Sequence, residues 1–404
     1  MKESYVTQLL NQVRVLDLTN VLAGPYACYQ LAQLGAEVIK VERPLQGDLA
    51  RQLGADAQRN AEMMGVSFLA QNAGKQSVTI DFKHPQGKAL FKKLVATADV
   101  VVENFRAGVM DRLGLGYDDL KEIKPDLIYC AISGFGQDGP MSTLPAYDQI
   151  IQGQSGLMSV TGDAQSGPLR VGYPVCDTIG GMTAAFAIAS ALFRRERTGQ
   201  GESIDVSMLE STLGTMGWVV SNWLVSGIRP ERFGNQNMTA VPSGTFKTGD
   251  GLINIAANQQ AQFERLAKAV GHEEWLADPR FETRDKRKQH REQFNVLLEA
   301  ALRERSATEW SEIFNARDIP AGEVRTVEQA LDNPHMEARG FIKTVRDETR
   351  GDEIKVVRSG FRLESGDPAP TSYPPRLGEH TLSILESLGL STQEIAALQA
   401  DNVI

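Results

Sequence analysis

An alternation of apolar strands and helices near the start of the chain is the feature that most restricts its fold. Arg14-Val-Leu-Asp-Leu18 predicts a buried strand, and Tyr26 to Leu34 predicts a helix that Gly35 ends. Glu37-Val-Ile-Lys-Val41 then predicts a second strand. A strand–helix–strand unit of this kind is typical of parallel strands joined by a crossover helix. We therefore expect an α/β domain built on a parallel sheet.

The same alternation continues through the first half of the chain. Predicted strands cover 99–103, 127–133 and 203–206, and predicted helices cover 85–96, 117–123, 147–155, 178–195 and 209–225. At 404 residues the chain is longer than one hydrophobic core usually organises, so we expect at least two domains. Residues 1–227 are assigned to a large, Rossmann-like α/β domain.

A polar segment rich in Pro, Gly and Asn, from Ile228 to Gly244, predicts a linker into a smaller α+β domain. That domain covers 228–335, with a strand predicted at 252–256 and helices at 260–270, 289–303 and 307–316. The charged run from Arg284 to Arg291 is interpreted as a solvated helix entry. Residues 336–404, with strands predicted at 341–345 and 354–357, form a C-terminal segment that returns to the large domain.

The composition argues against several classes of partner. A net charge of −9 disfavours nucleic acid and anionic membrane surfaces. The N-terminal residues lack the basic and apolar regions of a signal peptide, and the apolar window from Met182 to Phe193 is too short to span a bilayer. Cys28, Cys130 and Cys176 are odd in number and far apart, which favours reduced thiols. We therefore expect a cytoplasmic protein.

Asp177 is the only charge in an apolar, small-residue segment that continues to Phe193. Burying a carboxylate at the start of so apolar a helix is costly unless the charge is used or hydrogen-bonded. Two interpretations follow: Asp177 caps the helix by accepting hydrogen bonds from first-turn amides, or it is a catalytic carboxylate. The Cys176 thiol is an alternative nucleophile, but no histidine lies near it in sequence, which favours a small buried hydrophobe.

Basic residues at the ends of predicted loops and strands suggest an anionic ligand. They are Arg43, Lys75, Lys83, Arg106 and Arg112. A ligand with several phosphates needs donors spread in this way, although any one of these residues alone is more simply surface charge. The first loop, Leu22-Ala-Gly-Pro25, lies where ligands collect in α/β sheets. It lacks the GxGxxG pattern, which argues against a dinucleotide.

Several sequence blocks occur in a characteristic order along the chain. They are Arg14-Val-Leu-Asp-Leu-Thr19, Leu22-Ala-Gly-Pro25, Gly35-Ala-Glu-Val-Ile-Lys-Val-Glu-Arg43, Asp99-Val-Val-Val-Glu-Asn104, Gly134-Phe-Gly-Gln-Asp-Gly-Pro140, Gly199-Gln-Gly-Glu-Ser-Ile-Asp205 and Leu377-Gly-Glu-His-Thr381. Together they closely resemble the class III CoA-transferase family. This family includes formyl-CoA:oxalate, carnitine and succinyl-CoA:dicarboxylate CoA-transferases and the related α-methylacyl-CoA racemases.

The resemblance implies roles for individual positions. The family's catalytic aspartate, which is acylated in the transferases, falls on Asp177. Its CoA-contacting positions fall on Arg43, on the segments from Ile80 to Lys83 and from Asn104 to Arg106, and on Arg112, with Ala146-Tyr147-Asp148 at the acyl end. Tentative substrate contacts are Leu22, Gly136 and Arg170. Leu22 replaces a glutamine of formyl-CoA transferase, whose glycine-rich lid is also absent, so a formyl or oxalate substrate is disfavoured.

The activity implied by the resemblance is CoA transfer from an acyl-CoA, with succinyl-CoA as the expected donor, to a free carboxylic and specifically dicarboxylic acid. The implied intermediates are an aspartyl anhydride and an aspartyl-CoA thioester. Coenzyme A is then a co-substrate, and neither a metal nor a tightly bound cofactor is expected. The blocks at 127–133 and 155–162 look most like the succinyl-CoA:dicarboxylate branch. Arg170 is the candidate contact for a distal carboxylate, and it is equally a candidate for a structural or CoA-binding role.

Two other functions remain as alternatives: a racemase and a non-catalytic CoA-binding protein. A racemase of this family pairs a histidine with the aspartate in a Gly-His-Asp block, where this chain has Ala146-Tyr147-Asp148. Tyrosine, with a reference pKa of about 10, is a poor base at neutral pH, and this favours transfer. A non-catalytic CoA-binding protein would have no use for Asp177. The resemblance also implies an interlocked homodimer in which each chain threads through its partner.

Overall fold

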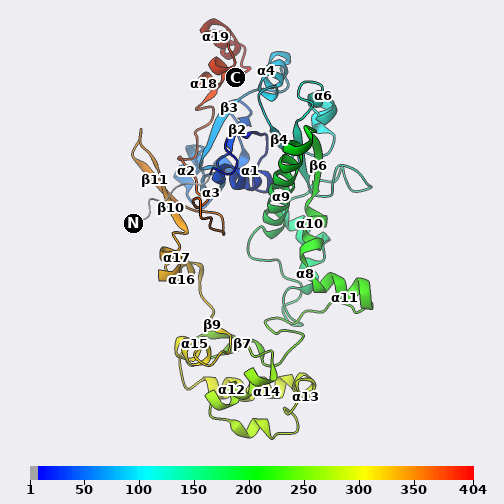
Figure 1. The fold of residues 1–404 in the computed structure, drawn as a ribbon, viewed down its shortest axis with the longest axis vertical. Helices are drawn as coiled ribbons and strands as arrows, with labels where there is room; N and C mark the ends of the chain where they lie inside the picture. The colour runs from blue at the N-terminus through cyan, green and yellow to red at the C-terminus, as the bar shows by residue number, and fades with distance from the viewer. Residues whose placement is uncertain (1–7) are drawn as a thin grey trace. The chain divides into compact units, whose positions relative to one another are not determined.

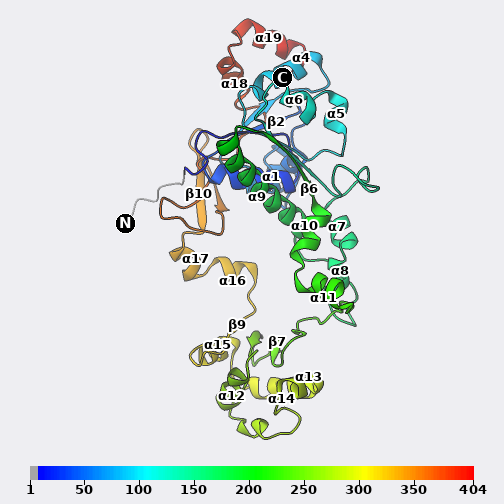
Figure 2. The ribbon, with the colours of Figure 1, turned by 45° about the vertical axis from the view of Figure 1, so that its right-hand side comes forward.

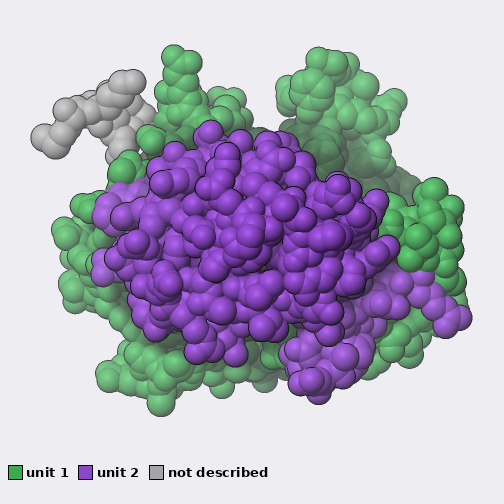
Figure 3. Space-filling view, turned by 90° about the horizontal axis from the view of Figure 1, so that it is seen from below, with its two compact units in different colours: residues 1–157, 170–228, 337–404 green, residues 158–169, 229–336 purple. Residues whose placement is uncertain are grey.

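The computed structural model describes residues 8–404, and the chain divides into two compact units, which Figure 3 colours separately. Unit 1 contains the described residues 8–157 together with 170–228 and 337–404, and unit 2 contains 158–169 and 229–336. The boundaries predicted from the sequence fall after residues 227 and 335, and residues 158–169 were predicted to belong to the large domain. Each unit has its own hydrophobic core.

Unit 1 is built on a six-stranded parallel sheet with the strand order β3-β2-β1-β4-β5-β6 (Figure 1). The strands are β1 (Arg14–Asp17), β2 (Glu37–Glu42), β3 (Lys75–Thr79), β4 (Val100–Glu103), β5 (Ile128–Ser133) and β6 (Glu202–Ser207). In register, Val15 pairs with Val38 on one side and with Val100 on the other. The predicted α/β fold is confirmed. Because the strand order reverses between β1 and β4, the loops after these two strands border the crevice where parallel sheets bind ligands.

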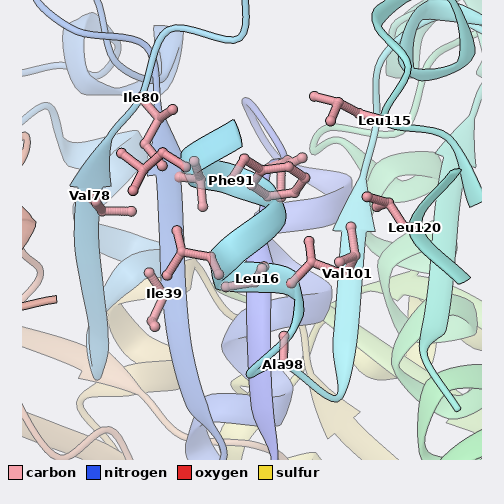
Figure 4. Close-up of a cluster of buried hydrophobic side chains, with 14 of the residues drawn as sticks. Leu16, Ile39, Val78, Ile80, Phe91, Ala98, Val101, Leu115 and Leu120 are labelled. Atoms are coloured by element: carbon pink, nitrogen blue, oxygen red, sulfur yellow. The ribbon is translucent and has the colours of Figure 1, made fainter. Parts of the chain in front are cut away.

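Helices cover both faces of this sheet. On one face Leu16 and Ile39 pack against Phe91 of α4 (Pro85–Val95), as Figure 4 shows. On the other face Val15 and Val38 pack with α1 (Ala23–Gln33) and α9 (Val175–Thr198). Adjacent strand residues enter different cores because side chains alternate along a strand.

The remaining helices of unit 1 are short. They are η1 (Leu49–Gln52), α2 (Ala57–Ala61), α3 (Val66–Asn72), α5 (Val109–Leu113), α6 (Tyr117–Lys121), α7 (Asp148–Gln154), α10 (Met208–Thr215), α11 (Trp218–Ser226), α18 (Thr381–Ser387) and α19 (Thr392–Ala400). Two more, α8 (Leu157–Val160) and α17 (Pro334–Ala338), cross between the units. The single helix predicted at 209–225 is wrong, because Gly217 (φ 56°) separates α10 from α11. The helix predicted from Tyr26 begins at Ala23, since Pro25 in a first turn needs no amide partner.

Helix α9 is longer than the apolar window that the sequence analysis considered. By length and composition alone it would suffice to cross a membrane, and 44% of its most apolar stretch is buried inside the protein. It contacts α1, β5 and β6, which is the packing expected of a core helix. This packing fixes its N-terminal turn near the carboxyl edge of the sheet.

The segment from 337 to 404 belongs to unit 1, where Figures 1 and 2 place α18 and α19 beside α4. It contributes an antiparallel hairpin, β10 (Ile342–Asp347) and β11 (Asp352–Val357). It also covers the free edge of β3, where the His380 amide donates to the Ser77 carbonyl at 2.9 Å. An edge strand covered in this way is protected from pairing with another chain.

Unit 2 contains a three-stranded antiparallel sheet of β7 (Ser243–Lys247), β8 (Leu252–Ala256) and β9 (Ala321–Glu323) (Figure 2). Its helices are α12 (Gln260–Ala269), η2 (Glu273–Leu276), α13 (Arg284–Gln289), α14 (Arg291–Leu302), α15 (Ala307–Asn315) and α16 (Val327–Leu331). The charged run at 284–291 forms α13 and the first residue of α14, but Arg287 is buried rather than solvated. Its guanidinium donates to the Val241 and Phe281 carbonyls.

Candidate active site

A cavity of about 340 Å³ lies in unit 1 at the carboxyl ends of β1, β2 and β3 and against α5. Apolar side chains including Leu18, Val41 and Phe82 form much of its wall. Four of the side chains predicted to bind CoA line it together, although their positions span seventy residues: Arg43, Ile80, Lys83 and Arg112. An apolar wall with three cations suits a flat ring system attached to phosphates.

A second cavity, of about 290 Å³, adjoins the first, and Asn20 and Phe105 line both. It lies at the ends of β1, β4 and β5. Its lining includes the predicted positions Leu22, Asn104, Arg106, Tyr147 and Asp177. The two cavities therefore join the predicted CoA-binding cations to the predicted catalytic carboxylate along one edge of the sheet.

Asp177 reaches this cavity because of how α9 packs. It is the third residue of the helix, and α9 approaches α1 so closely that a Cβ on Gly181 would lie 2.5 Å from the Ala23 carbonyl oxygen. The interpretation of Asp177 as the helix cap is wrong, because Pro174 occupies the cap position and no side chain there bonds to the helix. No group within residues 8–404 donates a hydrogen bond to the Asp177 carboxylate.

Asp148, from α7, accepts hydrogen bonds from the amides that begin α9. Its Oδ1 accepts from the Cys176 amide at 2.8 Å and lies 3.5 Å from the Asp177 amide nitrogen, while Gln152 Nε2 donates to its Oδ2 at 2.7 Å. Asp148 is buried and does not line either cavity. It therefore holds the turn that carries Asp177, and leaves the Asp177 carboxylate uncommitted.

Burial, and secondarily the negative charge of Asp148, raises the pKa of Asp177 from 3.8 to about 7. A carboxyl group with this pKa is partly ionised at neutral pH, and as an anion it is more basic than an ordinary aspartate. The neighbouring Cys176 is fully buried, and burial raises the pKa of its thiol to about 11. Since the thiolate is the nucleophilic form of cysteine, Asp177 is the better placed nucleophile.

Replacing Asp148 with Asn is expected to lower the pKa of Asp177. The substitution removes the neighbouring charge but keeps an oxygen that can accept from the Cys176 amide. The pKa should stay above 3.8, because burial, the larger cause of the shift, is unchanged. NMR titration of ¹³C-labelled aspartate carboxyl groups in parent and variant measures the change, and an identical Asp177 titration in both would contradict the assigned coupling.

Comparison with known proteins decides the family. A family model described as CoA-transferase family III matches residues 10–381. The chain belongs to this family. Its relatives include the succinyl-CoA:glutarate CoA-transferase of Mus musculus, which is 36% identical over 94% of this chain and 86% of the relative. The succinyl-CoA–D-citramalate CoA-transferase of Chloroflexus aurantiacus is 36% identical over 98% of both chains. Among solved structures, a CAIB/BAIF family protein from Brucella suis is 35% identical, with a TM-score of 0.84 over 95% of this chain and all (100%) of that chain.

The family and enzyme class implied by the sequence resemblance are thus confirmed. Within this class III CoA-transferase, three predicted positions besides Asp148 lie outside the lining of both cavities. Arg170 is exposed and Gly136 (φ 92°) follows β5, and neither belongs to the lining of either cavity. Lys75, interpreted as a ligand contact, is buried and donates to Asp17 Oδ2 at 2.8 Å.

Of the two residues shared by the cavities, Asn20 was not predicted from the sequence. Asn20 and Phe105 line both cavities. The backbone of Asn20 is bonded reciprocally by the Asn104 side chain, at 2.8 Å in each direction. Phe105 falls within the segment Asn104 to Arg106 that the family resemblance assigns to CoA. The sequence around Asn20 does not indicate that it lines the cavities, because its placement depends on a contact with Asn104, 84 residues away.

Proposed function

We propose that this class III CoA-transferase moves CoA from an acyl-CoA, with succinyl-CoA as the preferred donor, to a free dicarboxylic acid through covalent intermediates on Asp177. The observation that carries this proposal is the uncommitted, partly buried carboxylate of Asp177 in a cavity that adjoins three cations. The donor and the acceptor class are supported by the two succinyl-CoA-dependent relatives, which act on glutarate and D-citramalate.

The two cavities suggest how an acyl-CoA binds. The adenine and phosphates occupy the first cavity, where Arg43, Lys83 and Arg112 supply charge-assisted donors. The pantetheine arm passes Asn20 and Phe105, and its thioester reaches Asp177 in the second cavity. This path keeps the sulfur beside the carboxylate after CoA is released, and such proximity replaces a bimolecular encounter.

Chemistry begins when an Asp177 oxygen attacks the thioester carbonyl carbon. The carbon–sulfur bond breaks, CoA leaves as a thiolate, and a mixed anhydride joins Asp177 to the acyl group. The thiolate then attacks the Cγ of Asp177, so the donor acid leaves as a carboxylate and an aspartyl-CoA thioester remains. The acceptor carboxylate attacks the same Cγ and displaces the thiolate. The thiolate finally attacks the acceptor's carbonyl carbon, which releases the new acyl-CoA and restores the Asp177 carboxylate.

The raised pKa of Asp177 favours its role as the attacking nucleophile, because a more basic carboxylate is the more reactive anion. The complete sequence exchanges one CoA thioester for another, and no proton is gained or lost overall. Racemisation would instead need a second base beside Asp177. No histidine lines either cavity within the described part of the chain, and the family's histidine position holds Tyr147.

Incubation of the enzyme with succinyl-CoA and a panel of free acids tests the function. Mass spectrometry of the CoA esters should show new acyl-CoA species that depend on the added acid, with glutarate-like dicarboxylates as the best acceptors. Deuterium incorporation into an α-methylacyl-CoA without any acceptor would select the racemase. Failure of every acid in the panel, with CoA bound, would contradict the proposed transfer.

We also infer that the functional enzyme is a homodimer. Large apolar side chains on α9 and α11 are exposed on a single chain, among them Phe186 (75%), Trp218 (66%) and Leu224 (75%). Exposed aromatic and aliphatic groups of this size are costly in water and mark protein interfaces. The interlocked arrangement implied by the family resemblance provides such an interface.

A further inference from the structure

The loop after β1 forms part of the wall of the cavity that contains Asp177, since Asn20, Val21, Leu22 and Ala23 all line that cavity. Side chains from other segments hold its backbone. Lys40 Nζ donates to the Thr19 carbonyl at 2.7 Å. The Val21 amide donates to Asp48 Oδ1 at 2.9 Å. The loop conformation is therefore imposed by tertiary contacts rather than by its own sequence.

Val21 shows why such contacts are needed. Its φ of 68° lies in the left-handed region, which is sterically unfavourable for a β-branched residue. A residue in this conformation persists only when its surroundings hold it there. The loop is also folded tightly onto α1, because a Cβ on Gly24 would lie 2.3 Å from the Thr19 side chain.

Lys40 and Asp48, which hold the loop, also form an ion pair with each other. Lys40 Nζ lies 3.0 Å from Asp48 Oδ2, and both side chains are fully buried at 0% exposure. Neither residue lines either cavity. Asp48 Oδ1 also accepts from the Ala50 amide, and Lys40 Nζ lies 3.9 Å from Asp17 Oδ2. A buried pair that breaks leaves an uncompensated charge, so the two residues act together.

We propose that the buried Lys40–Asp48 ion pair is a positioning element for acyl transfer, which fixes Val21 and with it the wall beside Asp177. The effect on turnover rests on the proposed function. The effect on loop conformation does not. The pair acts through the backbone of the loop, because no atom of either side chain reaches the substrate cavities.

The test is Asp48→Ala, made both in the parent and in a Val21→Gly background. In the parent we expect kcat to fall about 100-fold, the usual effect of displacing a catalytic geometry, with KM for the acyl-CoA changed by less than about threefold. Glycine adopts a positive φ without steric cost, so the same substitution in the Val21→Gly background should lower kcat by about threefold or less. Asp48→Asn keeps an oxygen that can accept from the Val21 amide, so its loss of kcat in the parent should lie between these two values.

Hydrogen exchange provides a readout that does not depend on the reaction. Amides of residues 19–23 should exchange faster in Asp48→Ala than in the parent, at a temperature where both are folded. An equal loss of kcat in both backgrounds would mean that the pair is merely structural and would overturn the proposal. The proposal would also be overturned if Asp48→Ala changed neither the exchange rates of these amides nor kcat. If the parent shows no transfer, the proposed function fails, and the exchange rates alone decide whether the pair holds the loop.

Discussion

Replacing Asp177 with Ala is expected to reduce acyl transfer by about 10⁴-fold or more, the scale seen when a covalent nucleophile is removed from an enzyme. The carboxylate is required twice in the proposed sequence, first for the anhydride and then for the aspartyl-CoA thioester. Initial rates with succinyl-CoA and a dicarboxylic acid measure the loss. Trapping with hydroxylamine or borohydride, followed by mass spectrometry, should modify the parent at Asp177 and leave the variant unmodified.

CoA affinity separates loss of chemistry from loss of folding. Calorimetry should give Asp177→Ala nearly the parent affinity for CoA, because Arg43, Lys83 and Arg112 lie in the other cavity. Glu210→Gln is the matched control, since Glu210 is also acidic and also in the first turn of its helix, α10, but is exposed and lines neither cavity. A variant without Asp177 that keeps more than about a tenth of the parent rate would refute the nucleophile assignment.

Asp177→Asn is expected to be more stable than the parent enzyme above neutral pH. Folding raises the pKa of Asp177 from 3.8 to about 7, so the folded state binds the proton more tightly than the unfolded state does. The free energy of unfolding therefore falls as pH rises between these two values and is constant above them. Amide replacement removes this penalty, and the gain reaches at most about 4 kcal/mol at pH 8.

Urea unfolding of both proteins at pH 4, 6 and 8 measures this difference. The midpoints should lie close together at pH 4, because this pH is only slightly above the unfolded-state pKa of 3.8 and little of the penalty has developed, and they should separate progressively up to pH 8. Glu210→Gln, which removes an exposed carboxylate outside both cavities, is measured in parallel as the control for loss of a negative charge. A stability difference that does not change with pH would show that ionisation of Asp177 is not its cause.

The strands and the catalytic carboxylate could be predicted because local patterns encode them. β1, β2, β4 and β5 are apolar runs followed by loops, and Asp177 is conspicuous as an isolated charge. β3 was missed because its buried polar residues resemble a loop in sequence. The Lys75 ammonium donates to Asp17, 58 residues away, and the Ser77 hydroxyl donates to Glu42, 35 residues away.

The construction of the site depends on contacts of the same long range. Asp148 accepts hydrogen bonds from amides 28 and 29 residues away at the start of α9. The residues around Asp148 therefore do not reveal that it, and not Asp177, bonds to these amides. The family resemblance assigned Tyr147 and Asp148 to the acyl end together, but only Tyr147 lines the cavity. The left-handed Val21 was likewise unpredictable, because valine has no intrinsic preference for that conformation.

The cover over β3 has a consequence for biosynthesis. Gly378, His380 and Thr381 bond to the edge of this strand and emerge from the ribosome about three hundred residues after it. During most of translation the nascent sheet therefore presents an unpaired strand, the kind of surface that recruits chaperones or pairs with neighbouring nascent chains. The contiguous stretch 229–336 has been synthesised by then and has its own core. It can therefore fold before residues 337–404, which complete unit 1, have been synthesised.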